Sequence, residues 1–319
     1  MVKNDILVAC MKIPPLNEFK STFDDIVWND VARLILKKHG ILFTEIDRAA
    51  QGENIVFLID RDFILKIYTP QKNGFRREKA ALEFVRGKTS IDVPALVDEG
   101  EIEGFFYLIT TQFNGESITR KEWLTFDKKV QIGLLTQLAS GLKELHSYNS
   151  EEIDFNWSEF LQIQIQSAID KQKAEGGNSE WIESIPPYFR KHLHLILERP
   201  VDAFQHGDVH FGNIRVVNND ANLRICGFFD FADSIKGFHE YEFVAIGVLM
   251  IQGQGELQRE FFRAYGYKDH EIDETLRRRM MLLTMLYEYS SLRRYAQRLR
   301  PEAVYCSLDE LERAIWNFV

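Results

Sequence analysis

The sequence has few cysteines and no long apolar run. Its three cysteines, Cys10, Cys226 and Cys306, lie far apart without C-x-x-C spacing, which argues against a disulfide framework or a zinc ribbon. We expect all three to be buried as small hydrophobic residues. The apolar runs are shorter than the roughly 20 residues of a membrane-spanning helix, and the N-terminus lacks the basic start and apolar stretch of a secretory signal. These absences predict a cytoplasmic protein without a membrane segment.

The composition is that of an ordinary globular protein. Of the 319 residues, 45% are hydrophobic and 27% are charged, which excludes the disordered, collagen-like and coiled-coil classes. With 39 basic and 48 acidic residues the net charge is −9. This acidic balance argues against nucleic-acid binding and is compatible with a cationic ligand.

The periodicity of the sequence changes near residue 115. Before this point, β-branched and aromatic runs alternate with turn residues, as in hairpins, and a charged helix candidate, Phe75–Arg86, interrupts them. We therefore predict an α+β fold with an antiparallel sheet, divided into a domain of residues 1–114 and a mostly helical domain of residues 115–319. The strands expected in the first domain are Ile41–Ala49, Ile55–Ile59, Phe63–Tyr68, Ala95–Glu99 and Phe105–Thr111.

After residue 115, apolar residues recur at three- and four-residue intervals, as in amphipathic helices. One hairpin, Ile214–Val217 with Leu223–Phe229, is expected to interrupt them. The expected helices are Trp123–Tyr148, Phe160–Lys173, Tyr188–Glu198, Glu242–Ile251, Glu256–Tyr265 and Ile272–Arg298.

The sharpest motif is HGDVHFGN at residues 206–213, followed by Asp230-Phe231. Phosphoryl transfer from a nucleotide needs a carboxylate that orients the attacking hydroxyl and accepts its proton, and it needs oxygen ligands for Mg²⁺. Asp208 can supply the carboxylate. Asn213 and Asp230 can supply the ligands, because a hairpin would return Asp230 to the same metal ion. The pattern H-x-D-x-x-x-x-N with a later D-F is typical of the catalytic and metal-binding loops of kinases.

Two other interpretations of this motif stay open. His206, Gly207 and Asp208 could form a turn with a structural histidine. Alternatively, His206, Asp208 and His210 could be the metal ligands of a hydrolase. The sequence has no HExxH motif and no convincing second ligand cluster, which weakens the hydrolase interpretation.

A lysine and a glutamate upstream complete the kinase pattern. Lys66 is the lone charge in an apolar strand, where a lysine is costly unless it is paired. Glu78 follows twelve residues later on the helix candidate. The order predicts a Lys–Glu pair that anchors nucleotide phosphates. Taken singly, Lys66 could also be a strand-edge lysine in solvent and Glu78 a surface acid.

The segment that would cover the phosphates is Gln51-Gly52-Glu53-Asn54. It has one glycine, whereas loops that bind phosphate through backbone N–H groups usually have several. Gly52 permits a close approach and Asn54 could contact a phosphate. A plain hairpin turn explains both residues equally well.

Together these motifs resemble those of the aminoglycoside phosphotransferase and choline-kinase-like small-molecule kinases, which share the protein-kinase fold. HGDVHFGNIRV is similar to the family's HGDLHxGNIxx loop, FFDFADS to IDFxDA, and Gly237–Glu242 to its G-x-x-x-Y-D/E turn. The layout is most similar to hygromycin-type aminoglycoside phosphotransferases. The resemblance implies a bilobal protein-kinase-like fold with a small N-terminal antiparallel-sheet lobe, one inserted helix, and a larger, mostly helical C-terminal lobe.

The resemblance also implies roles for single residues. Asp208 would be the catalytic base, and Asn213 and Asp230 would be the Mg²⁺ ligands. His206 would support the catalytic loop, as would Glu242, which stands where the family usually has Asp. The residues expected to bind the nucleotide are Lys66, Glu78, Gly52, Asn54, Thr111, Gln112 and Phe113, the last three by matching the hinge that binds adenine.

The acceptor in such enzymes lies between the catalytic loop and the helical lobe. Acidic side chains would hold a polyamine there, while aromatic faces would hold a quaternary ammonium or a sugar. A helix-core role is the alternative for Trp157 and for the pair Tyr287 and Tyr289. The predicted acceptor-binding residues are Asp233, Glu240, Trp157 and Glu288, with Phe155, Tyr287 and Tyr289 as further candidates.

We therefore predict a Mg²⁺-dependent phosphotransferase that moves the γ-phosphate of ATP or GTP to a hydroxyl of a small cationic molecule, foremost a hygromycin-like aminoglycoside. No nucleic acid, membrane or obligatory protein partner is expected. A kinase of choline, homoserine, fructosamine or a macrolide, and a non-catalytic nucleotide-binding module, are the alternatives. A protein kinase is disfavoured, because Asp230-Phe231-Ala232 is not D-F-G and no A-P-E segment follows.

Overall fold

The computed structural model describes residues 15–49, 52–70, 72–201, 203–219 and 222–319. The chain divides into two compact units. Unit 1 comprises the chain up to Arg86 together with Asp92–Asn114 and Phe229–Asp233, and unit 2 comprises Gly87–Ile91, Gly115–Phe228 and Ser234–Val319. The short segment Phe229–Asp233 therefore packs with the N-terminal part of the chain although it lies more than a hundred residues further on.

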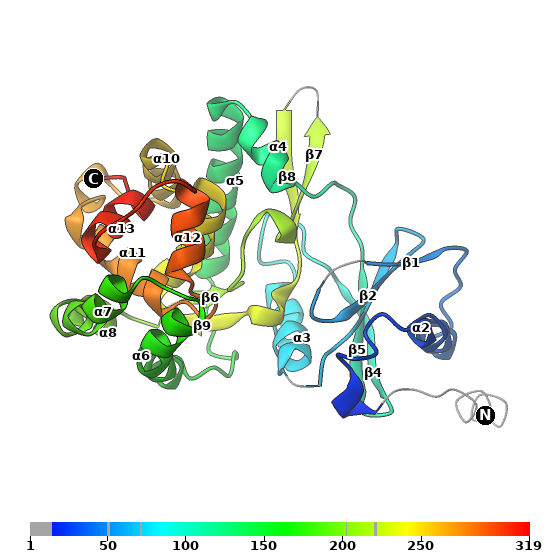
Figure 1. Cartoon of the computed structure of the whole chain (residues 1–319). Coiled ribbons are helices and arrows are strands. Elements are labelled where there is room, and N and C mark those ends of the chain that lie inside the picture. The colour runs from blue at the N-terminus through cyan, green and yellow to red at the C-terminus, as the bar shows by residue number, and fades with distance from the viewer. Residues whose placement is uncertain (1–14, 50–51, 71, 202, 220–221) are drawn as a thin grey trace. The chain divides into compact units, whose positions relative to one another are not determined.

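Unit 1 is built on a five-stranded sheet in which every neighbouring pair is antiparallel (Figure 1). The strand order is β1-β2-β3-β5-β4. Its strands are rich in β-branched and aromatic residues, which suit a pleated, half-buried surface. The strands are β1 (Ile46–Arg48), β2 (Ile55–Ile59), β3 (Phe63–Ile67), β4 (Leu96–Ile102) and β5 (Phe105–Thr111).

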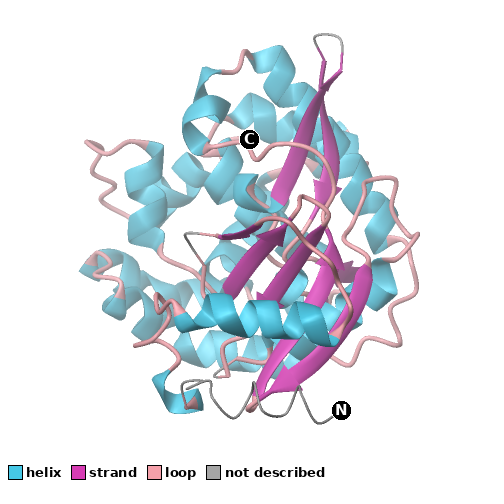
Figure 2. Cartoon of the chain, turned by 90° about the vertical axis from the view of Figure 1, so that its right-hand side faces the viewer, coloured by secondary structure: helices cyan, strands magenta, loops and turns pink. Residues whose placement is uncertain are grey.

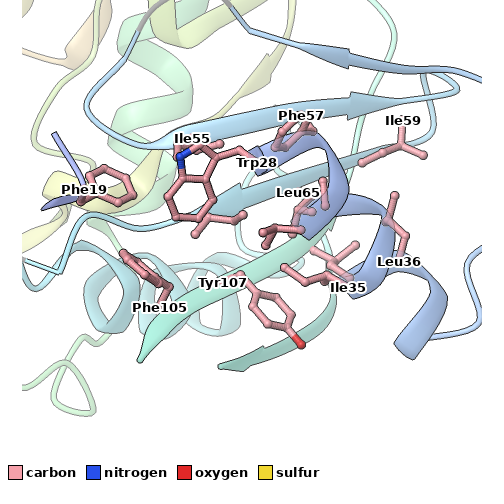
Figure 3. Close-up of a cluster of buried hydrophobic side chains, with 14 residues drawn as sticks. Phe19, Trp28, Ile35, Leu36, Ile55, Phe57, Ile59, Leu65, Phe105 and Tyr107 are labelled. Atoms are coloured by element: carbon pink, nitrogen blue, oxygen red, sulfur yellow. The ribbon is translucent and has the colours of Figure 1, made fainter. Parts of the chain in front are cut away.

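One face of this sheet is covered by α2 (Val27–Lys38), whose apolar residues recur at helical spacing. Trp28 is fully buried and meets the ring of Phe105 edge to face, with ring centroids 5.2 Å apart. Figure 3 shows this cluster, in which side chains of α2 lie against Phe57 and Leu65 of the sheet. Because neighbouring strand residues point to opposite faces, Lys66 lies on the face away from α2.

The remaining elements in the described part of unit 1 are one helix and two 3₁₀ turns. Helix α3 (Gly74–Val85) is the inserted helix, and it packs on a 3₁₀ turn, η3 (Phe231–Asp233). Gly74 comes close to Ala232 at this junction, since a Cβ at Gly74 would lie 3.5 Å from that of Ala232. A further 3₁₀ turn, η1 (Leu16–Glu18), precedes α2.

Unit 2 is mostly helical, with two short antiparallel ladders (magenta in Figure 2). Strand β6 (Ala203–Gln205) pairs with β9 (Ile235–Gly237), and β7 (Ile214–Asn219) pairs with β8 (Asn222–Phe228). The helices are α4 (Arg120–Thr125), α5 (Lys128–His146), α6 (Trp157–Ala174), α7 (Ser179–His192), α8 (His194–Leu197), α9 (Phe243–Ala245), α10 (Gly255–Tyr265), α11 (Glu274–Leu286), α12 (Leu292–Leu299) and α13 (Leu308–Ile315). The short helical turns are η2 (Phe211–Asn213), η4 (His239–Glu242), the π-helical η5 (Ile246–Ile251) and η6 (Asp269–Glu271).

Two of the long helices predicted from the sequence are each two helices. The predicted helix Trp123–Tyr148 lies within α4 and α5, and α5 begins at a new N-cap where Asp127 accepts the N–H of Val130. The predicted helix Ile272–Arg298 is α11 and α12, because Ser291 caps α12 by accepting the N–H of Arg294. Such caps satisfy N–H groups that a helix start leaves open, so a helical pattern can continue across a real break.

The cysteine prediction is correct for one residue and wrong for another. Cys226 is buried, as expected, whereas Cys306 is exposed in the segment before α13. Cys10 lies outside the described residues. Among the residues that the structure describes, no helix has the length and apolar character needed to cross a membrane.

Candidate functional site

Three charged residues predicted from the sequence meet in unit 1. The Lys66 ammonium donates to Glu78 Oε2 and to Asp230 Oδ1, each at 2.6 Å. Lys66 is 9% exposed and Glu78 is 6% exposed, so the Lys66–Glu78 ion pair is largely shielded from solvent. Strand β3 positions the lysine, α3 positions the glutamate, and the segment after β8 positions the aspartate.

The two carboxylates control the charge of Lys66. Burial by itself would lower the pKa of Lys66, but Asp230 and then Glu78 favour the ammonium more strongly, and the pKa is raised above its ordinary 10.5. Tyr68 Oη also donates to Glu78, and burial beside this carboxylate raises the pKa of the phenol well above 10.0. The site therefore holds a permanent cation at neutral pH beside the carboxyl groups of Glu78 and Asp230.

Asp230 has an unusual backbone. Its φ of 67° lies in the left-handed region, which costs free energy in a residue other than glycine and is common at functional sites. This conformation accompanies the turn that leads from β8 into η3 and brings the carboxylate to Lys66. The side chain is 45% exposed, so it also reaches solvent.

The predicted hinge residues follow β5 in unit 1. The Thr111 N–H donates to the Ala95 carbonyl at 2.9 Å, and the Gln112 N–H donates to the Asp62 carbonyl at 2.7 Å. These two N–H groups are used within the unit. Gln112 Oε1, by contrast, is buried without a hydrogen-bond partner in the described part of the chain, which is costly unless a ligand donates to it. An exocyclic amino group of a purine is a donor of this kind.

The predicted phosphate loop is partly a structural turn. Asn54 Oδ1 accepts the N–H of Thr69 at 2.9 Å, so this side chain links the start of β2 to the residue after Tyr68. Gly52 has a φ of 146°, a conformation for which glycine is suited. Gln51 lies outside the described residues. The phosphate-binding role of Gly52 and Asn54 stays a prediction.

In unit 2 the catalytic-loop motif follows β6 and is held by a buried carboxylate. Glu242 accepts the N–H of His206 at 2.6 Å and the N–H of Gly207 at 3.0 Å. Gly207 has a φ of 86°, which favours glycine at this turn. His206 is fully buried and its Nδ1 lies 3.4 Å from the N–H of Asp208. These contacts support the predicted structural roles of His206 and Glu242.

Asp208 and Asn213 lie together on this loop. Asn213 Nδ2 donates to the Asp208 carbonyl at 2.9 Å and to Asp208 Oδ2 at 3.2 Å. The Asn213 amide therefore turns its nitrogen to Asp208 and its oxygen elsewhere. The side chain of Asp208 is 23% exposed, so a base at this position remains accessible to solvent.

Oxygen ligands for a magnesium ion are available on both predicted ligand residues. No group of three or more His, Cys, Asp and Glu side chains gathers as a ready-made metal centre within the described ranges. Mg²⁺ in phosphoryl transfer needs only one or two protein oxygens, because the nucleotide phosphates and water complete its shell. The Asp230 carboxylate and the Asn213 amide oxygen fit this chemistry.

Two of the predicted acceptor-binding residues are core residues, which argues against that role. Glu240 is 2% exposed and forms a bidentate ion pair with Arg279, with distances of 2.6 and 2.8 Å. Trp157 is 5% exposed and packs on Gly237, where a Cβ would lie 2.4 Å from its ring. Glu240 has no oxygen to spare for a cation, and Trp157 matches the helix-core alternative.

The other two acceptor candidates are more accessible. Asp233 ends η3 in unit 1 and is half-buried, and Glu288 lies half-buried in the loop between α11 and α12 in unit 2. Their roles stay predictions. Of the further candidates, Tyr289 is 42% exposed and Tyr287 is 3% exposed. The ring of Phe155 packs on that of Phe160, with ring centroids 5.4 Å apart.

Sequence reasoning missed two contacts of the site. Tyr68 was not identified, although it follows Lys66 by two residues and so lies on the same face of β3. Tyr287 was identified as an acceptor or core candidate, but its hydroxyl lies 2.9 Å from the Gly207 carbonyl oxygen and 3.3 Å from Asp208 Oδ1. No pattern in the sequence links Tyr287 to a residue 79 positions earlier.

Comparison with solved structures identifies the fold. The GDP and kanamycin complex of APH(2″)-IIIa superimposes with a TM-score of 0.68 and 16% identity, covering 91% of this chain and 97% of the other. For ADP-bound APH(2″)-Ib the TM-score is 0.60 at 20% identity, with 91% and 99% covered. For APH(3″)-Id of Streptomyces rimosus with ADP and streptomycin it is 0.58 at 16% identity, with 81% and 98% covered. The predicted kinase-like α+β fold is confirmed.

The family is shown by a match over most of the chain. No curated protein matches this sequence. The model of the phosphotransferase enzyme family (APH), however, matches residues 46–283, a range that contains Lys66, Glu78, Asp208, Asn213 and Asp230. The chain therefore belongs to the phosphotransferase enzyme family, as the resemblance of its motifs indicated.

Proposed function

We propose that this protein transfers the γ-phosphoryl group of ATP or GTP to a hydroxyl of a small molecule. The observation that carries the proposal is the meeting of Lys66, Glu78 and Asp230 in unit 1, each contact at 2.6 Å. Three separate segments supply these residues, and a permanent cation between carboxylates suits the binding of a metal-chelated triphosphate. Membership of the phosphotransferase family gives the reaction class.

The chemistry assigns one role to each charged residue. Lys66 binds phosphate oxygens, and Glu78 and Tyr68 orient Lys66. Asp208 accepts the proton as the acceptor O–H bond breaks, the freed oxygen attacks the γ-phosphorus, and the bond to the β-phosphate oxygen breaks with its electron pair. Asp230 and Asn213 would each offer an oxygen ligand to Mg²⁺, which when bound supplies positive charge to the phosphates. Most of the rate then comes from positioning and electrostatics.

We further propose a hydroxylated amine of the aminoglycoside type as the acceptor, a hygromycin-like compound first. Structures similar to this one have kanamycin or streptomycin in their complexes. The net charge of −9 favours a cationic ligand. With Glu240 and Trp157 in the core, the local support rests on Asp233 and Glu288.

The test is consumption of Mg-ATP and Mg-GTP by the purified chain, alone and with hygromycin, kanamycin, streptomycin, choline, homoserine, a fructosamine and a macrolide. We expect acceptor-dependent consumption that falls at least about 100-fold in Asp208→Ala, the effect of losing a general base. The matched control is Asp170→Ala, because the Asp170 side chain is 84% exposed, and this variant should behave as wild type.

Each result decides between the alternatives. Turnover retained by Asp208→Ala would overturn the assignment of the base. Stimulation by choline, homoserine, a fructosamine or a macrolide but by no aminoglycoside would replace the acceptor class. A nucleotide-induced rise in Tm without turnover would favour a non-catalytic nucleotide-binding module.

A further inference from the structure

The two carboxylate oxygens of Asp208 have different surroundings. Oδ2 faces Asn213 Nδ2 at 3.2 Å and His210 Nε2 at 3.3 Å. His210 Nδ1 accepts the N–H of Gly212 at 2.9 Å, so in the neutral ring the proton is on Nε2, the nitrogen nearer Asp208. One hydrogen-bond donor and one imidazole nitrogen thus lie at Oδ2.

Oδ1 faces a single donor among the described residues. Tyr287 Oη lies 3.3 Å from Oδ1 and 2.9 Å from the Gly207 carbonyl oxygen, so one phenol proton is shared between them. A carboxylate oxygen has about two acceptor positions. Oδ1 therefore keeps one position for an incoming hydroxyl, while Oδ2 faces Asn213 and His210.

Tyr287 also completes the fixation of the turn before Asp208. The N–H of Gly207 is bound by Glu242 and its carbonyl by Tyr287. The peptide groups on both sides of Gly207, which has a left-handed backbone, are thereby hydrogen-bonded. Their partners, Glu242 and Tyr287, come from elements far apart in the sequence. The direction of the Asp208 side chain depends on this turn.

The loop that carries Tyr287 is hydrogen-bonded to other elements of unit 2. Lys171 of α6 donates to the Tyr287 carbonyl at 3.2 Å and to the Glu288 carbonyl at 3.4 Å. Gln172 accepts the N–H of Leu292 at 2.9 Å, and Tyr241 Oη accepts the N–H of Glu288 at 2.9 Å. These bonds tie the backbone around Tyr287 to α6 and η4.

We propose that Tyr287 is a positioning residue that holds Asp208 Oδ1 toward the acceptor hydroxyl, while Asn213 and His210 lie at Oδ2. The inference rests on the proposed function, because it gives a task to the catalytic base. It also couples the base to the loop of Glu288, a predicted acceptor-binding residue. A shift of that loop would turn Oδ1 away from the reacting oxygen, and misplacement by about 1 Å can cost on the order of 100-fold in rate.

A purely structural role would give a different result. The Tyr287 ring packs on Tyr241 and Tyr289, with centroids 5.4 and 5.9 Å apart. Tyr287→Phe keeps this packing and removes only the hydroxyl. The matched control is Tyr295→Phe, since buried Tyr295 donates to the Tyr289 carbonyl of the same loop at 3.3 Å. Its hydroxyl interacts with the Asp208 charge through space, but the described contacts include no hydrogen bond between them.

The experiment compares kcat, the KM for Mg-ATP and Tm in wild type, Tyr287→Phe, Tyr295→Phe and Asp208→Ala. Consumption is measured with the best acceptor, or with water as acceptor if none is found. We expect kcat to fall about 10- to 100-fold in Tyr287→Phe with KM changed less than about twofold, and Tyr295→Phe to stay within about twofold in kcat.

The other outcomes overturn the inference. A wild-type kcat in Tyr287→Phe would show that Asp208 does not need the hydroxyl. Equal losses in both tyrosine variants would assign the effect to loop packing, and a raised KM at constant kcat would make Tyr287 a binding residue. Full turnover in Asp208→Ala, by contrast, would remove the proposed function itself, so the two failures are distinguishable.

Discussion

The charges of two predicted site residues, Lys66 and Glu242, are stabilised differently in the two units. In unit 1 the Lys66 ammonium lies between two carboxylates at 2.6 Å. In unit 2 the Glu242 carboxylate accepts two backbone N–H groups at 2.6 and 3.0 Å, with His146 Nε2 3.6 Å away. Side chains can exchange partners when a charged ligand arrives, whereas backbone donors cannot move without the turn. The comparison indicates that the charges around Lys66 are suited to a charged ligand, whereas Glu242 holds the turn of His206 and Gly207.

The largest loss of stability is expected from replacing Glu242, which binds the backbone of the loop before Asp208. Glu242→Ala leaves two buried backbone donors, those of His206 and Gly207, without their acceptor, and we expect the free energy of unfolding to fall by about 3 kcal/mol. Because the same turn carries Asp208, kcat should fall as well. Urea denaturation with parallel kinetics measures both.

The graded control for this change is Glu242→Gln, which keeps one acceptor oxygen and should lose less stability than the alanine variant. If Glu242→Ala were as stable as wild type, Glu242 would not be the structural anchor of the loop. If kcat fell while stability stayed constant, its role would be in the chemistry, and the contrast between the units would disappear.

A smaller loss of stability is expected from replacing Tyr68, which donates to Glu78 beside Lys66 in unit 1. Tyr68→Phe removes the hydroxyl that donates to Glu78, and hydrogen bonds to charged groups contribute about 2 kcal/mol. We expect a stability loss of this size and a raised KM for the nucleotide, because Glu78 orients Lys66. Thermal unfolding and nucleotide titration test the two parts separately.

Tyr107→Phe is the matched control in the same sheet. Tyr107 is fully buried, and its hydroxyl lies 2.9 Å from His39 Nε2 rather than near Lys66. This variant should lose stability without a change in the KM for the nucleotide. A raised KM in both variants would mean that nucleotide binding depends on the stability of the whole sheet. The hydroxyl of Tyr68 would then have no specific effect on Lys66 and Glu78.

The charged residues of unit 1 could largely be predicted from the sequence. Lys66 stands out because a charge in an apolar strand needs a partner, and Glu78 and Asp230 are the acids that kinase motifs place in the correct order. The pairing of Lys66 with Glu78 is therefore predictable from chemistry and spacing, whereas the contact of Lys66 with Asp230 was not predicted. The family and the fold class are confirmed as well, whereas the choice of a hygromycin-like acceptor stays a proposal.

The partners of side chains far apart in sequence could not be predicted. Glu240 was taken for an acceptor ligand because nothing in the sequence shows that Arg279 forms an ion pair with it. The loop that carries Tyr287 was hidden, because helical spacing continues through residues 287–291 and the break depends on the cap at Ser291. Local patterns predict elements, but such pairings depend on how the elements pack.

The smallest expected effect is the change with pH in the stability that the Lys66 charge contributes. Its pKa is raised above 10.5 in the folded chain. A group of this kind contributes stability that is fully present below its unfolded pKa and is lost as the pH rises through the folded pKa. The difference in unfolding free energy between wild type and Lys66→Met should therefore be constant from about pH 7 to about pH 10 and shrink only at higher pH. Lys173→Met, at a side chain 62% exposed, serves as control. A difference that already decayed between about pH 8 and pH 9 would mean that the ammonium loses its proton there, and that unit 1 does not keep a permanent cation between its carboxylates.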